Sequence, residues 1–150
     1  MLKRAVAKCH SSLFSPSAGD LLHLPFRDET FDKAVSITAL EFIEDAQGAV
    51  GELFRVTRNG GVVVVATLNS LSPWAEERRE KARHEETIFS KAIFRSPREI
   101  LALAPFPGVA RTAVHFRNDS DPETAMNAEQ EGRNKNLDTG AFVAVRWQKP

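Results

Sequence analysis

Two hydrophobic patterns predict the centre of the fold. In residues 45–57, apolar side chains recur at the i, i+3, i+4, i+7 and i+8 spacing of an amphipathic helix, with Asp45 placed to cap its start. They are Ala46, Ala49, Val50, Leu53 and Phe54. Residues 60–68, GGVVVVATL, are apolar on both faces of a strand, which is typical of a central parallel strand between helices. Together the patterns predict an α/β fold with a doubly wound sheet.

Shorter patterns predict the remaining elements. In chain order these are a helix at 1–10, a weak strand at 12–18, a strand at 31–37, a charged helix at 73–89, a short helix opened by the capping box at 96–99, a strand at 109–116, a polar loop at 118–138 and a strand at 141–147. In the helix at 45–57, Gly48 and Gly51 suggest close approach to the sheet, and Gly60 after it suggests a left-handed stop. In the charged helix, Glu77 and Lys81 are spaced for an ion pair.

Composition narrows the class of protein. The chain has 150 residues, enough for one domain, and its 20 basic residues balance 20 acidic ones, which argues against nucleic acid as the main partner. The single cysteine, Cys9, predicts a reducing compartment, and no Cys/His spacing suggests a metal site. No apolar run is long enough to cross a membrane. We therefore expect a cytoplasmic protein; a basic, serine-containing start at residues 1–19 leaves an organelle transit peptide as the alternative.

Three stretches carry a resemblance to a known family. They are GDLLHLPFRDETFD at residues 19–32, LEFIED at 40–45 and RVTRNGG at 55–61, and the capping box at 96 and GAFV at 140–143 follow in order. In these stretches the chain resembles the class I S-adenosylmethionine-dependent methyltransferases, in particular methyltransferase type 11 and the quinone-biosynthesis branch. The resemblance is dense from residue 20 to 61 and looser beyond.

The resemblance implies which part of the family's domain this chain contains. MLKRA at residues 1–5 is similar to the family's helix after its second strand, so the first two strands and the Gly-rich turn would lie before Met1. No G-x-G-x-x-G sequence occurs in the 150 residues. We therefore expect residues 1–150 to be the C-terminal two-thirds of a class I methyltransferase domain, with a Rossmann-like sheet that lacks its first two strands.

The resemblance also implies a cofactor, S-adenosyl-L-methionine, and residues that contact it. The family's aspartate in this motif accepts a hydrogen bond from the adenine amino group, and the next residue lines the adenine; these are Asp20 and Leu21. The position that contacts the methionine part corresponds to Ile37, with Thr38 beside it. Taken outside the motif, Asp20 is more commonly an acid that caps a turn than a ligand contact.

Candidate catalytic residues are fewer, because methyl transfer from a sulfonium depends mainly on alignment and desolvation. His23 is a candidate general base, although a loop histidine next to leucines is commonly a partly buried turn residue. Glu41 occupies a family position near the transferred methyl, with an ordinary surface glutamate as the alternative. No residue is assigned to a metal.

Two functions follow from these expectations. The first is methyl transfer to a small-molecule acceptor. The alternative is an inactive remnant or interaction module that needs a partner chain, because without the first two strands the strand at 31–37 has an unpaired edge. That edge predicts pairing with a second copy or a complementing chain. A nucleic-acid-binding module is a distant third hypothesis, given the zero net charge.

Overall fold

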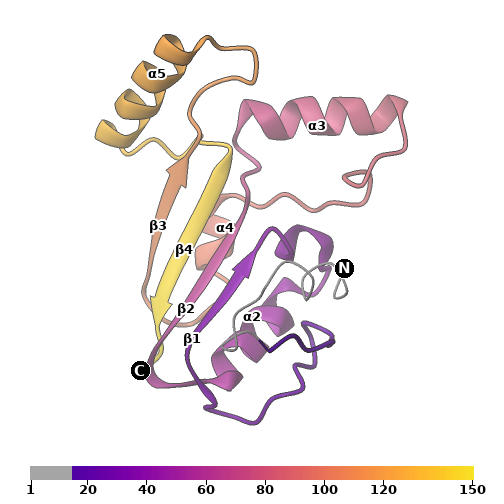
Figure 1. The fold of residues 1–150 in the computed structure, drawn as a ribbon, viewed down its shortest axis with the longest axis vertical. Coiled ribbons are helices and arrows are strands. Elements are labelled where there is room, and N and C mark those ends of the chain that lie inside the picture. Colours follow the sequence, from indigo (N-terminus) through magenta and orange to yellow (C-terminus); the bar gives the residue numbers. More distant parts are fainter. Residues whose placement is uncertain (1–14) are drawn as a thin grey trace.

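A four-stranded mixed sheet organises residues 15–150, the part of the chain that the computed structural model describes (Figure 1). The strands are β1 (Phe31–Ile37), β2 (Thr57–Leu68), β3 (Gly108–Ala113) and β4 (Phe142–Gln148), in the order β1-β2-β4-β3. β1 and β2 are parallel, whereas β4 is antiparallel to both of its neighbours. The four strands predicted within residues 31–147 are confirmed, and β2 is a central strand as expected.

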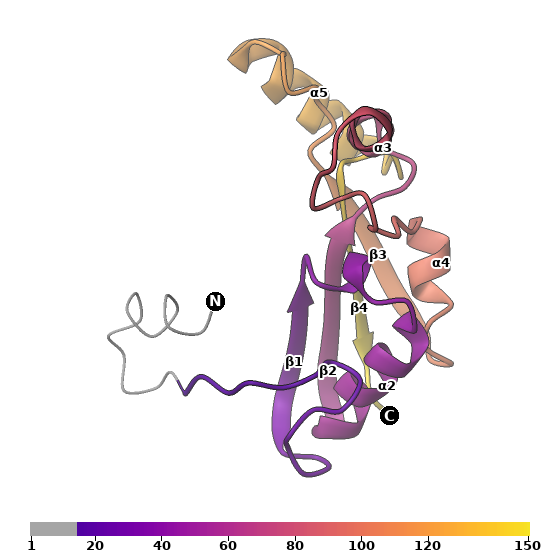
Figure 2. The same ribbon diagram turned by 90° about the vertical axis from the view of Figure 1, so that its right-hand side faces the viewer.

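Helices cover one face of this sheet. The helical elements are η1 (Leu40–Phe42), α2 (Ala46–Val56), α3 (Pro73–His84), α4 (Pro97–Leu101) and α5 (Pro122–Asn134). Figure 2 shows α2 and α4 on the same side of the strands, with α3 and α5 beyond the upper end of the sheet. The α/β Rossmann-like arrangement is confirmed. Among residues 15–150, however, no helix covers the second face, which we call the open face.

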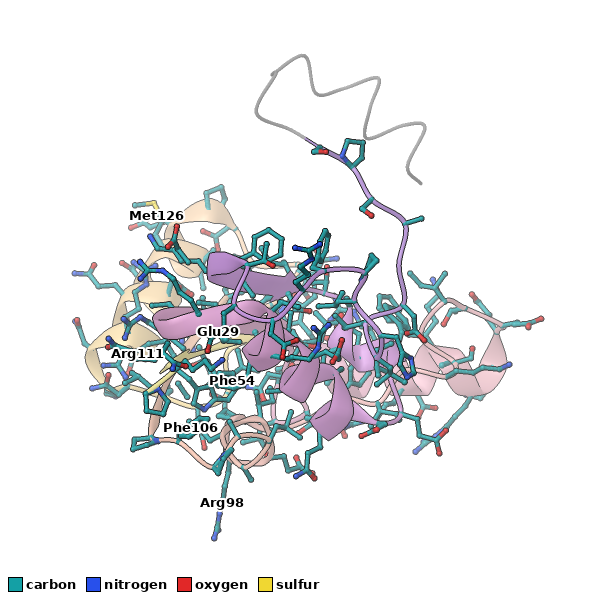
Figure 3. The ribbon with its side chains drawn as sticks, turned by 90° about the horizontal axis from the view of Figure 1, so that it is seen from below. Glu29, Phe54, Arg98, Phe106, Arg111 and Met126 are labelled. Carbon is teal, nitrogen blue, oxygen red and sulfur yellow. The ribbon has the colours of Figure 1, made fainter. Side chains whose placement is uncertain are left out.

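The core lies between the sheet and α2 and α4. Along β2, Val63 and Val65 are fully buried on this side, while Val62 and Val64 on the open face remain half-exposed. The alternation arises because successive side chains of a strand point to opposite faces. An aromatic contact helps to close the core: the rings of Phe54 and Phe106, both labelled in Figure 3, lie 5.3 Å apart.

The amphipathic helix α2 forms as its sequence predicts, with a different role for its glycines. Asp45 caps it by accepting a hydrogen bond of 2.8 Å from the Gly48 amide. Gly48 and Gly51 do not provide close approach to the sheet: a Cβ on Gly48 would lie 2.4 Å from the Asp45 carboxylate, and one on Gly51 would meet nothing within 4 Å. Gly60 does have a positive φ of 75°, but it lies within β2, after the helix has ended.

Three predicted elements differ from the structure or lie outside it. The predicted helix at 1–10 lies outside the described residues, and so does the first part of the weak strand at 12–18, whose residues 15–18 form no strand. The polar stretch at 118–138 is not a loop, because it contains α5. Asp121 caps this helix by accepting from the amides of Glu123 and Thr124, with Pro122 at the first position. The Asp-Pro-Glu start was the overlooked helix signal.

The charged helix α3 is shorter than predicted and is held through its neighbours. It ends at His84, and of its residues only Ala75 is buried. The predicted Glu77–Lys81 pair does not form, because Glu77 accepts from Arg117 at 3.0 Å. The indole of Trp74 also donates to the Phe116 carbonyl at 2.7 Å, so α3 is fastened to the β3–α5 connection.

Within residues 15–150, no helix combines the length and apolar character that a membrane span requires.

Candidate functional site

Asp20 lies in an exposed turn and carries an ionised carboxylate. Its Oδ1 accepts a hydrogen bond of 3.0 Å from the Leu22 amide, and its Oδ2 lies 3.5 Å from Nδ1 of His23. The Leu22 amide, followed by the His23 contact, holds the pKa of Asp20 below its usual value. The predicted strand end at this position is absent: Asp20 forms only an isolated bridge with His23. The carboxylate both caps a turn and presents a charged acceptor.

The segment of residues 20–28, which we call the Asp20 loop, lies beside the free edge of β1. Figures 1 and 2 together show this indigo segment outside the edge strand, next to α2. Leu21 is half-buried against the main core, with Leu22 and Leu24. His23 points outward, with its side chain 85% exposed, so the partly buried turn histidine expected from sequence is not observed.

Ile37 and Thr38 lie at the carboxyl end of β1. The Ile37 side chain is 65% exposed on the open face. Thr38 has a φ of 49°, in the left-handed region that a β-branched residue rarely adopts, and its amide donates to the Ala66 carbonyl at 2.8 Å. Strain of this kind concentrates at functional sites, and the carboxyl ends of parallel strands are where α/β sheets bind ligands. The strained residue therefore coincides with a predicted cofactor contact.

Glu41 is buried, which contradicts its alternative interpretation as a surface glutamate. It lies in η1 with 1% of its surface exposed, and its Oε2 accepts from the Thr67 hydroxyl at 2.7 Å. Near Glu41, the guanidinium of Arg78 in α3 lies over the Trp74 ring, 5.2 Å from its centre. Burial lowers the pKa of Arg78. A buried carboxylate at the carboxyl end of β1 and β2 is unusual enough to be a functional candidate.

The structure brings some of the predicted residues together and leaves others apart. Ile37, Thr38 and Glu41 share the carboxyl end of β1, whereas Asp20 and His23 lie in the Asp20 loop. No hydrogen bond between described residues joins the two groups. Ile37, Thr38 and the Asp20 loop lie on the side of β1 that has no partner strand among the described residues, whereas Glu41 is buried.

Two residues that the sequence did not single out shape the carboxyl end of the parallel strands. Arg95 donates to the carbonyls of Leu40 at 2.9 Å and Ile43 at 3.0 Å, which ties the segment before α4 to η1. Asn69, fully buried after β2, donates to the Gly140 carbonyl at 2.8 Å. These contacts join residues more than fifty positions apart, and no local motif marks them.

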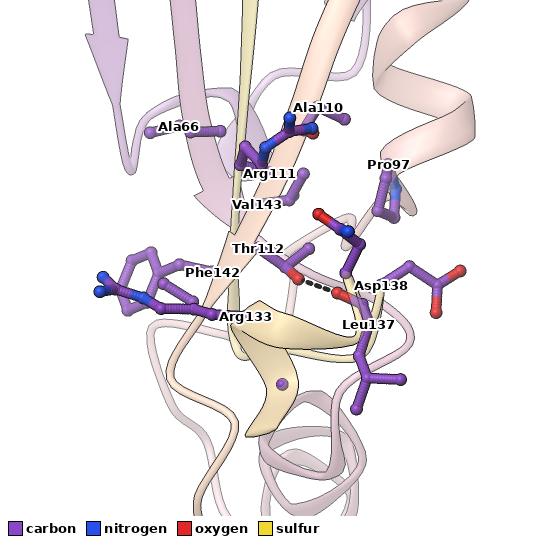
Figure 4. A pocket seen from close by; sticks show the side chains of 14 residues that line it. Ala66, Pro97, Ala110, Arg111, Thr112, Arg133, Leu137, Asp138, Phe142 and Val143 are labelled. Carbon is purple, nitrogen blue, oxygen red and sulfur yellow. Dashed lines mark hydrogen bonds between the residues drawn. The ribbon is translucent and has the colours of Figure 1, made fainter. Parts of the chain in front are cut away.

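A separate pocket of about 480 Å³ lies between β3, β4 and α5 (Figure 4). Its polar side chains are those of Arg111, Thr112, Arg133, Asn136 and Asp138, and Thr112 donates to the Leu137 carbonyl. None of the six predicted site residues lines it. The pocket is therefore distinct from the surface that borders β1.

Comparison with known proteins agrees with this geometry. Residues 1–65 match the family model of a methyltransferase domain. Over 49 residues the chain is 49% identical to the demethylmenaquinone methyltransferase of Streptomyces griseus. The matched region covers 33% of this chain and 21% of that protein. The chain thus spans less than a third of the curated relative's length.

Two solved structures share the fold. An S-adenosylmethionine-dependent methyltransferase of Thermotoga maritima is 25% identical with a TM-score of 0.66, over 88% of this chain and 62% of that one. A putative methyltransferase of Haloferax volcanii, solved with a methyltransferase activator, is 18% identical with a TM-score of 0.72, over 100% and 68% of the two chains, and shows the fold alone. The chain is thus similar to a methyltransferase domain over residues 1–65 and shares the fold of solved S-adenosylmethionine-dependent methyltransferases.

Proposed function

We propose that this chain takes part in methyl transfer from S-adenosylmethionine to a small-molecule acceptor in the cytoplasm. The observation that carries the proposal is the strained backbone of Thr38, at the carboxyl end of β1 and next to Ile37, the position expected to contact the methionine part of the cofactor. An ionised Asp20 beside the same edge supports it, because an adenine amino group requires a hydrogen-bond acceptor.

Each residue is assigned the cofactor contact that suits its chemistry. Asp20 accepts from the adenine amino group, Leu21 offers an apolar surface to the ring, and Ile37 and Thr38 contact the methionine part. The cofactor supplies an already activated methyl group, so the protein's task is to align it with the acceptor and exclude water. Neither Glu41 nor His23 is assigned a catalytic step: Glu41 is covered by protein, and His23 faces solvent.

Residues 1–150 are proposed to be the C-terminal two-thirds of the family's domain, and this has a consequence for affinity. The Gly-rich sequence that allows close backbone approach to such a cofactor does not occur in them. We therefore expect the isolated chain to bind S-adenosylmethionine weakly, with a dissociation constant of about 1 mM or higher.

An NMR titration of the isotope-labelled chain with S-adenosylhomocysteine tests this proposal. We expect amide shifts confined to the Asp20 loop and to Ile37 and Thr38. Shifts confined to the pocket between β3, β4 and α5 would contradict the site, and the absence of any shift would contradict the function. Micromolar affinity by calorimetry would contradict the view that these residues hold only part of the binding site.

The free edge of β1 favours a second candidate function, an interaction module. β1 is an edge strand whose outward residues Val35 and Ile37 are 56% and 65% exposed. Unpaired apolar edges recruit further strands, from a second copy or a complementing chain. Self-association that depends on concentration, in a chain that shows no response to S-adenosylhomocysteine, would favour this candidate over the enzyme.

A further inference from the structure

Two side chains of α2 hold the backbone of the Asp20 loop at successive points. The Leu24 amide donates to Oε2 of Glu52 at 2.8 Å. Arg55 donates through Nη2 to the Leu24 carbonyl at 3.0 Å and through Nη1 to the Phe26 carbonyl at 2.9 Å. Both polar groups of Leu24 are therefore bound by residues one helical turn apart on α2.

The two side chains also bind each other, so they form one unit. Arg55 Nε lies 2.6 Å from Glu52 Oε1 and Nη2 lies 2.8 Å from Oε2, a two-point contact that uses the planar fork of the guanidinium. Nη1 adds a 2.7 Å contact to Asp28 at the end of the loop. The Arg55 and Glu52 side chains are 32% and 18% exposed, so solvent competes little for these bonds.

Among residues 15–150, Asp20 itself has no comparable anchor. The side-chain contacts of its carboxylate are to Leu22 and His23, both within the loop. Among the described residues, the loop is attached to the rest of the fold by its leucines against the core, by the contact of Phe26 with Phe31 and by the Glu52–Arg55 unit. Because apolar packing is non-directional, the unit is what sets the orientation of the backbone that carries Asp20.

We propose that Glu52 and Arg55 are positioning residues of the cofactor site, which fix the backbone of the Asp20 loop and so the position of Asp20 and Leu21. This inference rests on the proposed function. According to this proposal, Glu52 and Arg55 raise the affinity for the cofactor without contacting its adenine, because they position the residues that do.

Arg55→Lys tests the inference, since lysine keeps the charge and loses the fork. We expect the protection of the Leu24 amide against hydrogen exchange to fall about tenfold and the dissociation constant for S-adenosylhomocysteine, measured by NMR titration, to rise about fivefold, with the sheet amides unchanged. Arg58→Lys is the matched control: Arg58 pairs with Asp32 between exposed side chains and does not contact the loop, so neither value should change.

The outcomes separate this inference from the proposed function. A wild-type chain that responds to S-adenosylhomocysteine while Arg55→Lys binds it equally well overturns the positioning role alone. Equal losses in Arg55→Lys and Arg58→Lys overturn it as well. A wild-type chain without any response contradicts the function and this inference together. If Arg55→Lys does not fold, Glu52→Gln takes its place, since glutamine can still accept from Leu24 but loses the charged contact with Arg55.

Discussion

At the scale of single residues, Asp20 combines a structural and a binding role that a substitution can separate. Asp20→Ala removes the acceptor for the Leu22 amide in an exposed turn, so we expect a loss of about 1 kcal/mol or less in the free energy of unfolding. Cofactor-induced amide shifts should disappear, because the proposed adenine contact is lost. Chemical denaturation and NMR titration measure the two effects, and unchanged affinity in the variant would remove Asp20 from the site.

Glu52 makes stability depend on pH. The hydrogen bonds from Arg55, aided by the Leu24 amide, lower its pKa from 4.5 to about 2 in the folded chain. A carboxyl group with a lowered folded pKa stabilises the fold above its unfolded value, and this contribution is lost as the pH falls from about 4.5 to about 2.

Glu52→Gln should therefore reduce stability near neutral pH and flatten its dependence on pH across that acidic interval, as measured by denaturant unfolding at several pH values. Glu85→Gln is the control, since Glu85 and Lys81 lie 3.7 Å apart between exposed side chains. An unchanged pH profile in Glu52→Gln would show that the Glu52–Arg55 contact does not form in solution.

At the scale of elements, two helical glycines are expected to respond to alanine in opposite directions. A Cβ on Gly132 of α5 would lie 2.2 Å from the His115 ring, so Gly132→Ala should destabilise the docking of α5 on the end of β3 by about 1–3 kcal/mol. Gly51 of α2 has open space around it, so Gly51→Ala should stabilise by up to about 1 kcal/mol. Thermal unfolding measures the stability change of both variants, and hydrogen exchange of α5 amides measures the docking of α5 in Gly132→Ala.

The contrast between the two positions is the control. Both substitutions raise helix propensity equally, so a difference between them reports the contact with His115. If Gly132→Ala also stabilised the protein and left α5 exchange unchanged, α5 would not pack on His115 as the structure shows.

At the scale of the whole molecule, the two edges of the sheet expose apolar residues in different settings. Val35 is 56% exposed on β1 and Val109 is 51% exposed on β3. Among residues 15–150, no helix lies on the open face beside β1, whereas β3 runs up to α5 (Figure 2). We expect association to proceed through β1.

Val35→Lys should suppress self-association in sedimentation velocity over a range of protein concentrations, because a lysine on an edge strand opposes pairing with another strand. Val109→Lys should have no effect on it. Folding should be unchanged in both variants, since both side chains already face solvent. Equal suppression by the two variants would assign association to the open face as a whole and not to the β1 edge.

Local patterns were sufficient for most of the elements. The apolar stripe of α2, the β-branched run of β2 and the capping box of α4 were each predicted because neighbours in sequence carry the signal. The resemblance to methyltransferases and the prediction for Asp20 also rest on a contiguous motif, residues 19–32. α5 also had a local signal, its Asp121-Pro122 start, which the polarity of the surrounding residues obscured.

Tertiary structure alone decided which faces and side chains are covered. The open face, the burial of Glu41 beneath α3, the strained Thr38 and the Glu52–Arg55 unit all depend on contacts between residues tens of positions apart. The sequence by itself determined the four strands, most of the helices and the resemblance to methyltransferases, because periodicity and motifs are local. The three-dimensional fold decided which residues border the proposed site, since burial and backbone strain depend on distant parts of the chain.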